Sequence, residues 1–95
     1  MMKTFTSTLL VFSLLILTVP AQSQVNHEYE KGKKYLYSGK FEEAVTTLKS
    51  YVEKKPSASA YYLLGYALYE LGRHDEAHKY FQEAYLINPE FSPMK

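Results

Sequence analysis

The chain has 95 residues, with 11 Lys and Arg against 10 Asp and Glu, so its formal net charge is +1 at pH 7. This balance excludes the strongly basic surface that proteins use to bind phosphate backbones, and we expect no nucleic-acid partner. The absence of cysteine excludes disulfide bonds, thiol chemistry and the lipid anchor of a lipoprotein.

The first part of the chain, residues 1–21, has the composition of a secretory signal peptide. Lys3 is its only charged residue, and an apolar run extends from Leu9 to Val19. Because a membrane-spanning helix needs about 20 apolar residues, this run favours cleavage over the alternative of an uncleaved anchor. We expect cleavage after Ala21, or after Ser23 as the second choice. The protein is then exported, periplasmic or secreted, with no stable membrane insertion after cleavage.

The remaining residues, 22–95, are expected to form one small domain in which apolar residues recur at helical spacings. Gly39 and Gly72 each follow such a segment, and glycine readily adopts the left-handed conformation that ends a helix. Pro56 and Pro89 mark the ends of the other two segments, because proline cannot continue a helix. The sequence therefore predicts four helices, over His27–Ser38, Phe41–Lys54, Ser59–Leu71 and His74–Asn88.

The second half of this domain alternates small and large apolar side chains, which lets two antiparallel helices pack closely. The residues that carry the pattern are Tyr61, Leu64, Gly65, Leu68, Ala77, Phe81, Ala84 and Pro89. In identity and spacing they resemble the signature of a tetratricopeptide repeat, with Tyr61 where the family often has Trp. We expect Ala77 to lie where the two helices of this hairpin come closest.

A weaker copy of the same pattern precedes it. A shift of 33 residues aligns similar residues, including the pairs Gly32–Gly65, Gly39–Gly72, Ala44–Ala77, Leu48–Phe81 and Pro56–Pro89. Residues 25–57 are therefore interpreted as repeat 1 and residues 58–91 as repeat 2. The resemblance implies an all-α fold of two tetratricopeptide-like helical hairpins, a short α-solenoid.

The first repeat departs from the family pattern at three positions. Glu28 and Lys31 stand where the family has apolar residues, and Tyr51 replaces the second small residue. A terminal repeat is expected to be atypical, because its outer face meets water. We expect the first helix of this repeat to pack through Tyr29, Tyr35 and Leu36.

The sequence gives little support to catalysis, and we expect neither enzymatic activity nor a cofactor. The four glycines are spread over helix and turn positions, so no phosphate-binding loop is formed. His74 and His78 stand four residues apart, as a pair of metal ligands on a helix would, but no third ligand is evident. We interpret them as packing or surface residues. A metal- or ligand-dependent accessory protein that uses both histidines is kept as an alternative.

In the family that this chain resembles, the first helix of each hairpin lines a concave groove that binds partner peptides. By position, the resemblance places six residues in this groove: Tyr29, Lys33, Tyr37, Tyr62, Tyr66 and Tyr69. The best-known subclass uses paired lysine and asparagine to hold a C-terminal carboxylate, and Lys33 and Tyr66 occupy the asparagine positions here, so that clamp is absent. Tyr62 and Tyr66 have the alternative interpretation of packing between the hairpins.

Few residues follow Pro89, so the last hairpin is expected to be uncapped, with apolar surface at Tyr80, Tyr85 and Phe91. The hypothesis is that a partner protein or a second copy covers this end. The favoured interpretation is a non-catalytic protein–protein interaction module that binds another protein or peptide. The alternative is a self-assembling structural module, a homodimer through the C-terminal hairpin.

Overall fold

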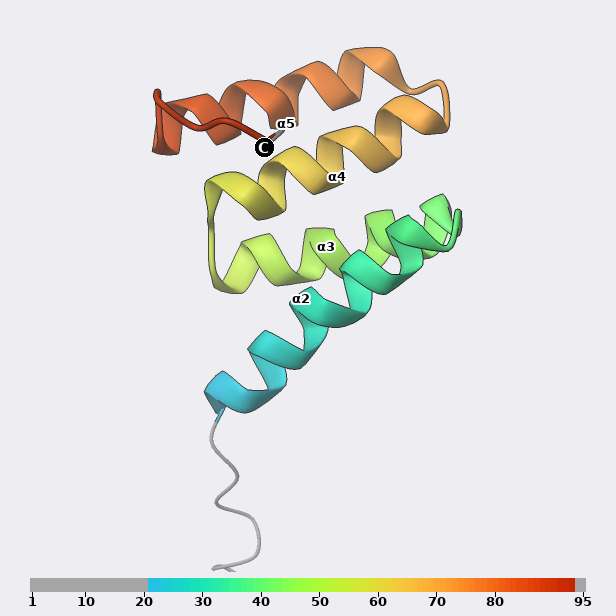
Figure 1. Ribbon diagram of the computed structural model, residues 1–95, viewed down its shortest axis with the longest axis vertical. Helices are drawn as coiled ribbons and strands as arrows, with labels where there is room; N and C mark the ends of the chain where they lie inside the picture. The colour runs from blue at the N-terminus through green and yellow to red at the C-terminus, as the bar shows by residue number, and fades with distance from the viewer. Residues whose placement is uncertain (1–20, 94–95) are drawn as a thin grey trace, which may run out of the picture.

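The computed structural model describes residues 21–93, with side chains from Val25, and this part consists of four α-helices joined by short turns. The helices are α2 (Ala21–Tyr37), α3 (Phe41–Lys54), α4 (Ala58–Glu70) and α5 (His74–Ile87). Each runs antiparallel to the next, so that α3 lies between α2 and α4, and α4 lies between α3 and α5 (Figure 1). The predicted all-α fold of two helical hairpins is confirmed.

The helix bounds agree with the prediction to within one residue, except at the start of α2. This helix begins at Ala21 rather than at His27. Residues 21–31 contain neither glycine nor proline, so nothing in them opposes helix formation. The predicted signal peptide, residues 1–21, lies outside the described residues except for Ala21. Among the helices of residues 21–93, none is both long enough and apolar enough to cross a membrane.

The turns inside the two hairpins have the same geometry. Gly39 and Gly72 have φ angles of 78° and 81°, which confirms the predicted left-handed ends. After Gly72, the backbone N–H of Arg73 donates to the Leu68 carbonyl at 2.9 Å. The turn between the hairpins differs, because Ser57 caps α4 by accepting a hydrogen bond from the Ala60 N–H at 3.3 Å.

The two hairpins share one continuous core. Its buried residues are Leu36, Ala44, Val45, Leu48, Tyr51, Val52, Ala60, Leu64, Ala67, Leu68 and Ala77. Tyr29 and Tyr35 pack against this core, so the expected packing of α2 through these residues and Leu36 is confirmed. Tyr51, at 5% exposure, fills the space where the second hairpin has the small Ala84.

The unusual Glu28 is accommodated by hydrogen bonds to α3. The Ser50 hydroxyl donates to its carboxylate at 2.8 Å, and the Lys54 ammonium donates at 3.3 Å. A charged group at a usually apolar position is tolerated when its oxygens find such donors.

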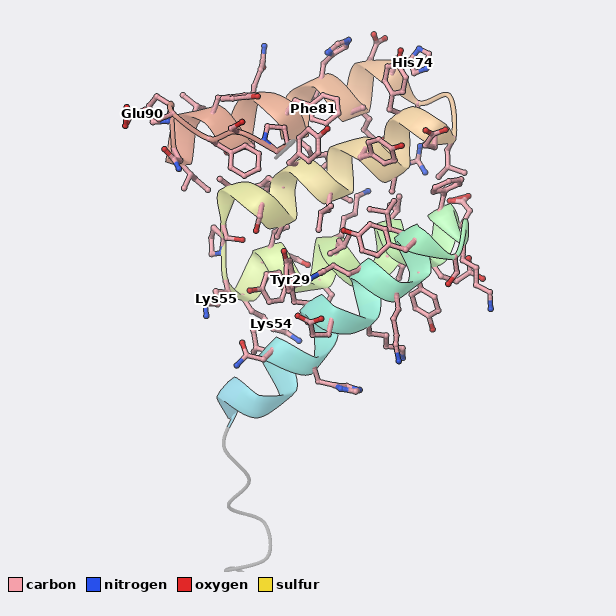
Figure 2. The ribbon with its side chains drawn as sticks, viewed as in Figure 1. Tyr29, Lys54, Lys55, His74, Phe81 and Glu90 are labelled. Atoms are coloured by element: carbon pink, nitrogen blue, oxygen red, sulfur yellow. The ribbon has the colours of Figure 1, made fainter. Side chains whose placement is uncertain are left out.

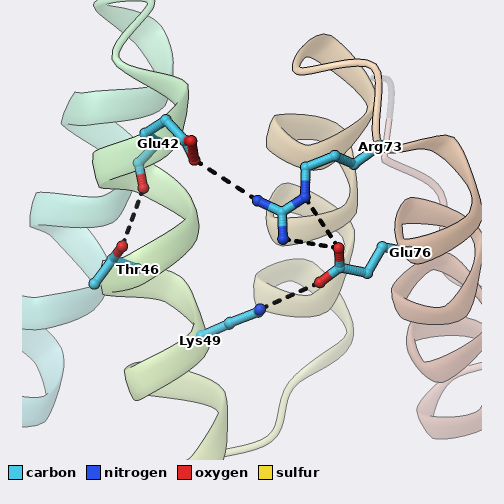
Figure 3. Close-up of polar contacts among 5 residues, drawn as sticks. All are labelled: Glu42, Thr46, Lys49, Arg73 and Glu76. Carbon is cyan, nitrogen blue, oxygen red and sulfur yellow. Dashed lines mark hydrogen bonds and ion pairs between the residues drawn. The ribbon is translucent and has the colours of Figure 1, made fainter.

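Charged side chains also connect α3 to the start of α5 (Figure 3). Arg73 Nη2 lies 2.8 Å from Glu76 Oε1, and Arg73 Nη1 lies 3.7 Å from Glu42 Oε1. Lys49 Nζ reaches the other oxygen of Glu76 at 3.2 Å. Hydrogen bonds from Lys49 first, and then from Arg73, lower the pKa of the Glu76 carboxyl.

Candidate peptide-binding groove

A pocket of about 430 Å³ opens between the C-terminal end of α2 and the middle of α4. Its lining residues are Leu36, Tyr37, Phe41, Tyr62, Leu63, Tyr66 and Pro93. The first three belong to the hairpin of α2 and α3, the next three to α4, and Pro93 to the segment after α5. Hydrophobic and aromatic side chains with a few hydroxyls are the usual lining of a ligand site.

The tyrosines of this pocket differ in how firmly they are held. Tyr62 is half-buried, and its ring centroid lies 5.4 Å from that of Phe81 in the hairpin core. Tyr66, one turn later on α4, is 42% exposed, and Tyr37 at the end of α2 is 73% exposed. Tyr62 is therefore held in place by packing, whereas the side chains of Tyr37 and Tyr66 are accessible to solvent.

An acidic residue, Glu70, lies beside Tyr66 on α4. The Glu70 carboxylate, one turn further along α4, raises the pKa of the Tyr66 phenol through its negative charge and then through a hydrogen bond. A tyrosine phenol is in any case neutral near pH 7, and its hydroxyl can then donate a hydrogen bond.

Tyr29 and Lys33 lie nearer the start of α2 and do not line this pocket. The Tyr29 hydroxyl is 3.1 Å from Ser59 Oγ, which links α2 to α4, and its ring centroid is 5.0 Å from that of Tyr51. Lys33 Nζ lies 5.4 Å from the Tyr29 centroid, within cation–π range. In Figure 2, the Tyr29 side chain lies between α2 and α3. In this position Tyr29 holds the two hairpins together.

Tyr69 lies at the opposite end of α4. Its ring stacks on the His74 imidazole, with a centroid distance of 4.3 Å, across the turn between α4 and α5. Of the six residues predicted for the groove, the structure therefore brings Tyr37, Tyr62 and Tyr66 together in one pocket. The other three, Tyr29, Lys33 and Tyr69, do not line this pocket.

Four lining residues of the pocket are not among the six predicted for the groove: Leu36, which was expected as a packing residue of α2, and Phe41, Leu63 and Pro93. Phe41 and Leu63 follow from hairpin geometry, because they flank the positions assigned to the groove. Pro93 has no such signal, because it reaches the pocket only through the return of the chain after α5. That return also places the Phe91 ring centroid 5.8 Å from the centroid of Tyr62.

The two histidines of α5 pack against aromatic rings. His74 stacks on Tyr69, and His78 meets the ring of Phe81 edge-on at a centroid distance of 6.3 Å. Within residues 21–93, no three His, Cys, Asp or Glu side chains gather as a metal site would require.

The four helices in two equivalent hairpins correspond to a known family. Residues 29–93 match the family model described as "Tetratricopeptide repeat". The chain belongs to the tetratricopeptide repeat family. Tetratricopeptide repeats generally mediate protein–protein interactions and are typically non-catalytic. A search of curated proteins and a search of solved structures returned no match.

Within the described residues, the outer face of α5 is a further apolar surface of this tetratricopeptide protein. Leu86 is 75% exposed, and Tyr85 and Ile87 are also exposed. An open pocket of about 440 Å³ there is lined by His78, Phe81, Gln82, Tyr85 and Leu86. Tyr80 and Phe91 were also expected to leave apolar surface open at this end. Instead, Tyr80 packs against Tyr61, and Phe91 lies against Tyr62 and Tyr85.

Proposed function

We propose that this tetratricopeptide protein is a non-catalytic interaction module that binds an extended peptide of a partner protein in the groove between α2 and α4. The pocket lined by Tyr37, Tyr62 and Tyr66 carries this proposal. Tyrosine rings give large contact areas at a low cost in conformational entropy, and their hydroxyls bond to a peptide backbone.

The surroundings of the pocket support an extended ligand rather than a compact one. We expect a bound peptide to extend beyond the pocket, along Tyr29 and Lys33 toward the start of α2 and along Tyr69 and Glu70 toward the end of α4. A peptide that follows this path meets a lysine at one end and a carboxylate at the other. A peptide with complementary charges at its ends is therefore favoured.

The test is selection from a random peptide library with the purified protein, followed by affinity measurements on the selected peptides. Tyr66→Ala should weaken binding about tenfold or more, because an exposed aromatic ring at the centre of a pocket is a typical hot spot. Tyr80→Ala is the matched control, since Tyr80 packs with Tyr61, Lys49 and Val52 in a different pocket. If both variants bind the selected peptides as the wild type does, the groove is not the binding site.

The module is proposed to act outside the cytoplasm, on the strength of the signal-peptide composition of residues 1–21. The full chain, expressed in a bacterium, should then accumulate outside the cytoplasm as a shortened protein. Mass spectrometry should find Gln22 as the first residue, or Gln24 for the second cleavage choice. A full-length protein that begins at Met1 and stays in the cytoplasm would contradict export.

A second candidate function is self-assembly through the outer face of α5, and the exposure of Leu86 favours it. The 33-residue shift aligns His78 and Tyr85 of this face with Val45 and Val52, which are buried on α3, so these two positions are suited to receive another helix. The outer side of α2 is polar instead, with exposed His27, Lys31 and Lys34. Two copies would therefore pair α5 with α5 rather than stack head to tail.

An antiparallel pair of α5 helices would also bring opposite charges of the two copies together. Lys79 and Glu83 lie on one flank of the apolar face, one turn apart, and both are exposed. A twofold axis between them sets each lysine opposite the glutamate of the other copy. Sedimentation velocity should show a dimer that dissociates on dilution and that Leu86→Glu abolishes. A monomer at all concentrations would exclude this candidate.

A further inference from the structure

The segment that follows α5 folds back over the groove side of the second hairpin. A short turn at Asn88 reverses the chain: the Glu90 N–H donates to Asn88 Oδ1 at 3.1 Å, and the Phe91 N–H donates to the Asn88 carbonyl at 3.0 Å. The segment then runs back from the end of α5 toward the middle of α4 (Figure 1). Glu90, at the turn, points outward into solvent (Figure 2).

Two side chains of this segment contact the groove side. The Phe91 ring lies between two tyrosines, with centroid distances of 5.8 Å to Tyr62 and 6.1 Å to Tyr85. Pro93 forms part of the wall of the 430 Å³ pocket, next to Tyr62 and Tyr66. Ser92 between them is exposed, whereas Phe91 and Pro93 are half-buried.

This alternation is the pattern of an extended peptide bound on a surface. In an extended chain, residues i and i+2 point to the same side and the residue between them points away. Segment 91–93 has no helical structure, and its two apolar side chains face the protein while its serine faces water. The segment therefore makes the kind of contacts proposed for a partner peptide, at one end of the same groove.

We propose that residues 91–93 occupy part of the partner site, and that the partner is an extended peptide with an aromatic residue followed two positions later by proline. Such a peptide binds in place of this segment and displaces it. The inference rests on the proposed function and adds to it the chemistry of the partner and a competitor within the chain.

The displacement has a measurable consequence for affinity. A segment joined to its site by a short turn competes at an effective concentration in the millimolar range. This competition weakens the apparent affinity of a free peptide by a factor. The factor is one plus the effective concentration of the segment divided by the dissociation constant of the segment for its site. We therefore expect about tenfold tighter binding once the segment no longer competes.

The experiment compares wild type with the double variant Phe91→Ala/Pro93→Ala, using a synthetic peptide with the sequence of residues 88–95 as the probe. A control peptide carries alanine at the positions of Phe91 and Pro93. The variant should bind the probe about tenfold more tightly than wild type does, and neither protein should bind the control peptide. Amide NMR shifts should centre on Tyr37, Tyr62 and Tyr66. Leu86→Ala is the control variant and should bind the probe as wild type does.

Circular dichroism checks that the double variant keeps its helices. If it does not, Pro93→Ala alone replaces it, with a smaller gain in affinity. Equal probe affinity for wild type and variant, or shifts centred on Leu86, would overturn the proposal. Library peptides that bind both proteins equally and lack the aromatic–x–proline pattern would overturn this inference alone. If no library peptide binds either protein, the proposed function fails, and this inference fails with it.

Discussion

Gly65 and Phe81 pack against each other in the second hairpin so closely that a β-carbon on Gly65 would lie 2.6 Å from Phe81 Cε1. In the first hairpin, a β-carbon on Gly32 would lie 2.7 Å from Leu48 Cδ2. These are the residue pairs that the 33-residue shift aligns, so the repeat in sequence is also a repeat of one contact. In each hairpin a glycine of the first helix makes room for a large side chain of the second.

Gly65→Ala should lower the free energy of unfolding by about 1–3 kcal/mol, because the added methyl group overpacks the contact with Phe81. The loss should appear although alanine is the better helix former by about 1 kcal/mol. Urea denaturation measures the change. The double variant Gly65→Ala/Phe81→Leu should recover part of the loss. A single variant as stable as wild type would mean that the Phe81 ring moves aside freely.

Ala77→Leu should be destabilising by about 1–3 kcal/mol, also through overpacking. Ala77 is fully buried, and its carbonyl oxygen lies 3.1 Å from the β-carbon position of Gly65, so the backbones of α4 and α5 are close there. Thermal melting measures the change. Lys79→Leu, which introduces leucine at an exposed position of the same helix, is the control that shows whether leucine itself, rather than overpacking, alters the stability. Equal melting of Ala77→Leu and wild type would contradict this helix pairing.

Gly72→Ala tests the turn rather than the packing. The φ angle of 81° is unfavourable for residues with a β-carbon, whereas no atom within 4 Å would contact the added methyl group. The variant should therefore lose about 1–2 kcal/mol from backbone strain alone. Gly72→Asn should lose less, since asparagine tolerates this conformation better. Equal stability of the three proteins in urea would show that this turn relaxes.

The stability of the protein should decrease in acid partly through Glu76. Because Lys49 and Arg73 lower the pKa of this carboxyl in the folded state, its stabilising contribution is complete above the ordinary glutamate pKa of about 4.3. The contribution is lost as the pH falls through the lower folded-state pKa. Melting temperatures between pH 7 and pH 3 should therefore fall less steeply for Glu76→Gln. Glu53→Gln, at an exposed position on α3, should follow the wild-type curve.

Much of the fold is local and could be predicted from the sequence. The helices from Phe41 onward, their turns at Gly39 and Gly72, and the small–large pairing of Gly65 with Phe81 depend on residues close together in the chain. Helical period, left-handed glycine and proline are local constraints, and they act before any tertiary contact forms. The start of α2 was predicted wrongly, because residues 21–26 permit a helix without marking where it begins.

The site depended more on tertiary structure, as its tyrosines show. Periodicity and family position assigned Tyr29, Tyr62 and Tyr66 alike to the groove. Only the stacking of the hairpins gave Tyr29 a bond to Ser59 and left Tyr66 facing the pocket beside Glu70. The helical period assigns a residue to a face, but what covers that face is decided by a different helix.

The sequence by itself determined that this chain forms two helical hairpins of the tetratricopeptide family, since the pattern of small, large and turn residues is compatible with little else. Only the tertiary structure decided that Tyr51 belongs in the core, that Leu86 lies open on α5, and that Phe91 and Pro93 return to the groove. These outcomes depend on contacts between segments distant in sequence. Such contacts depend on the space that neighbouring helices leave, which no local pattern specifies.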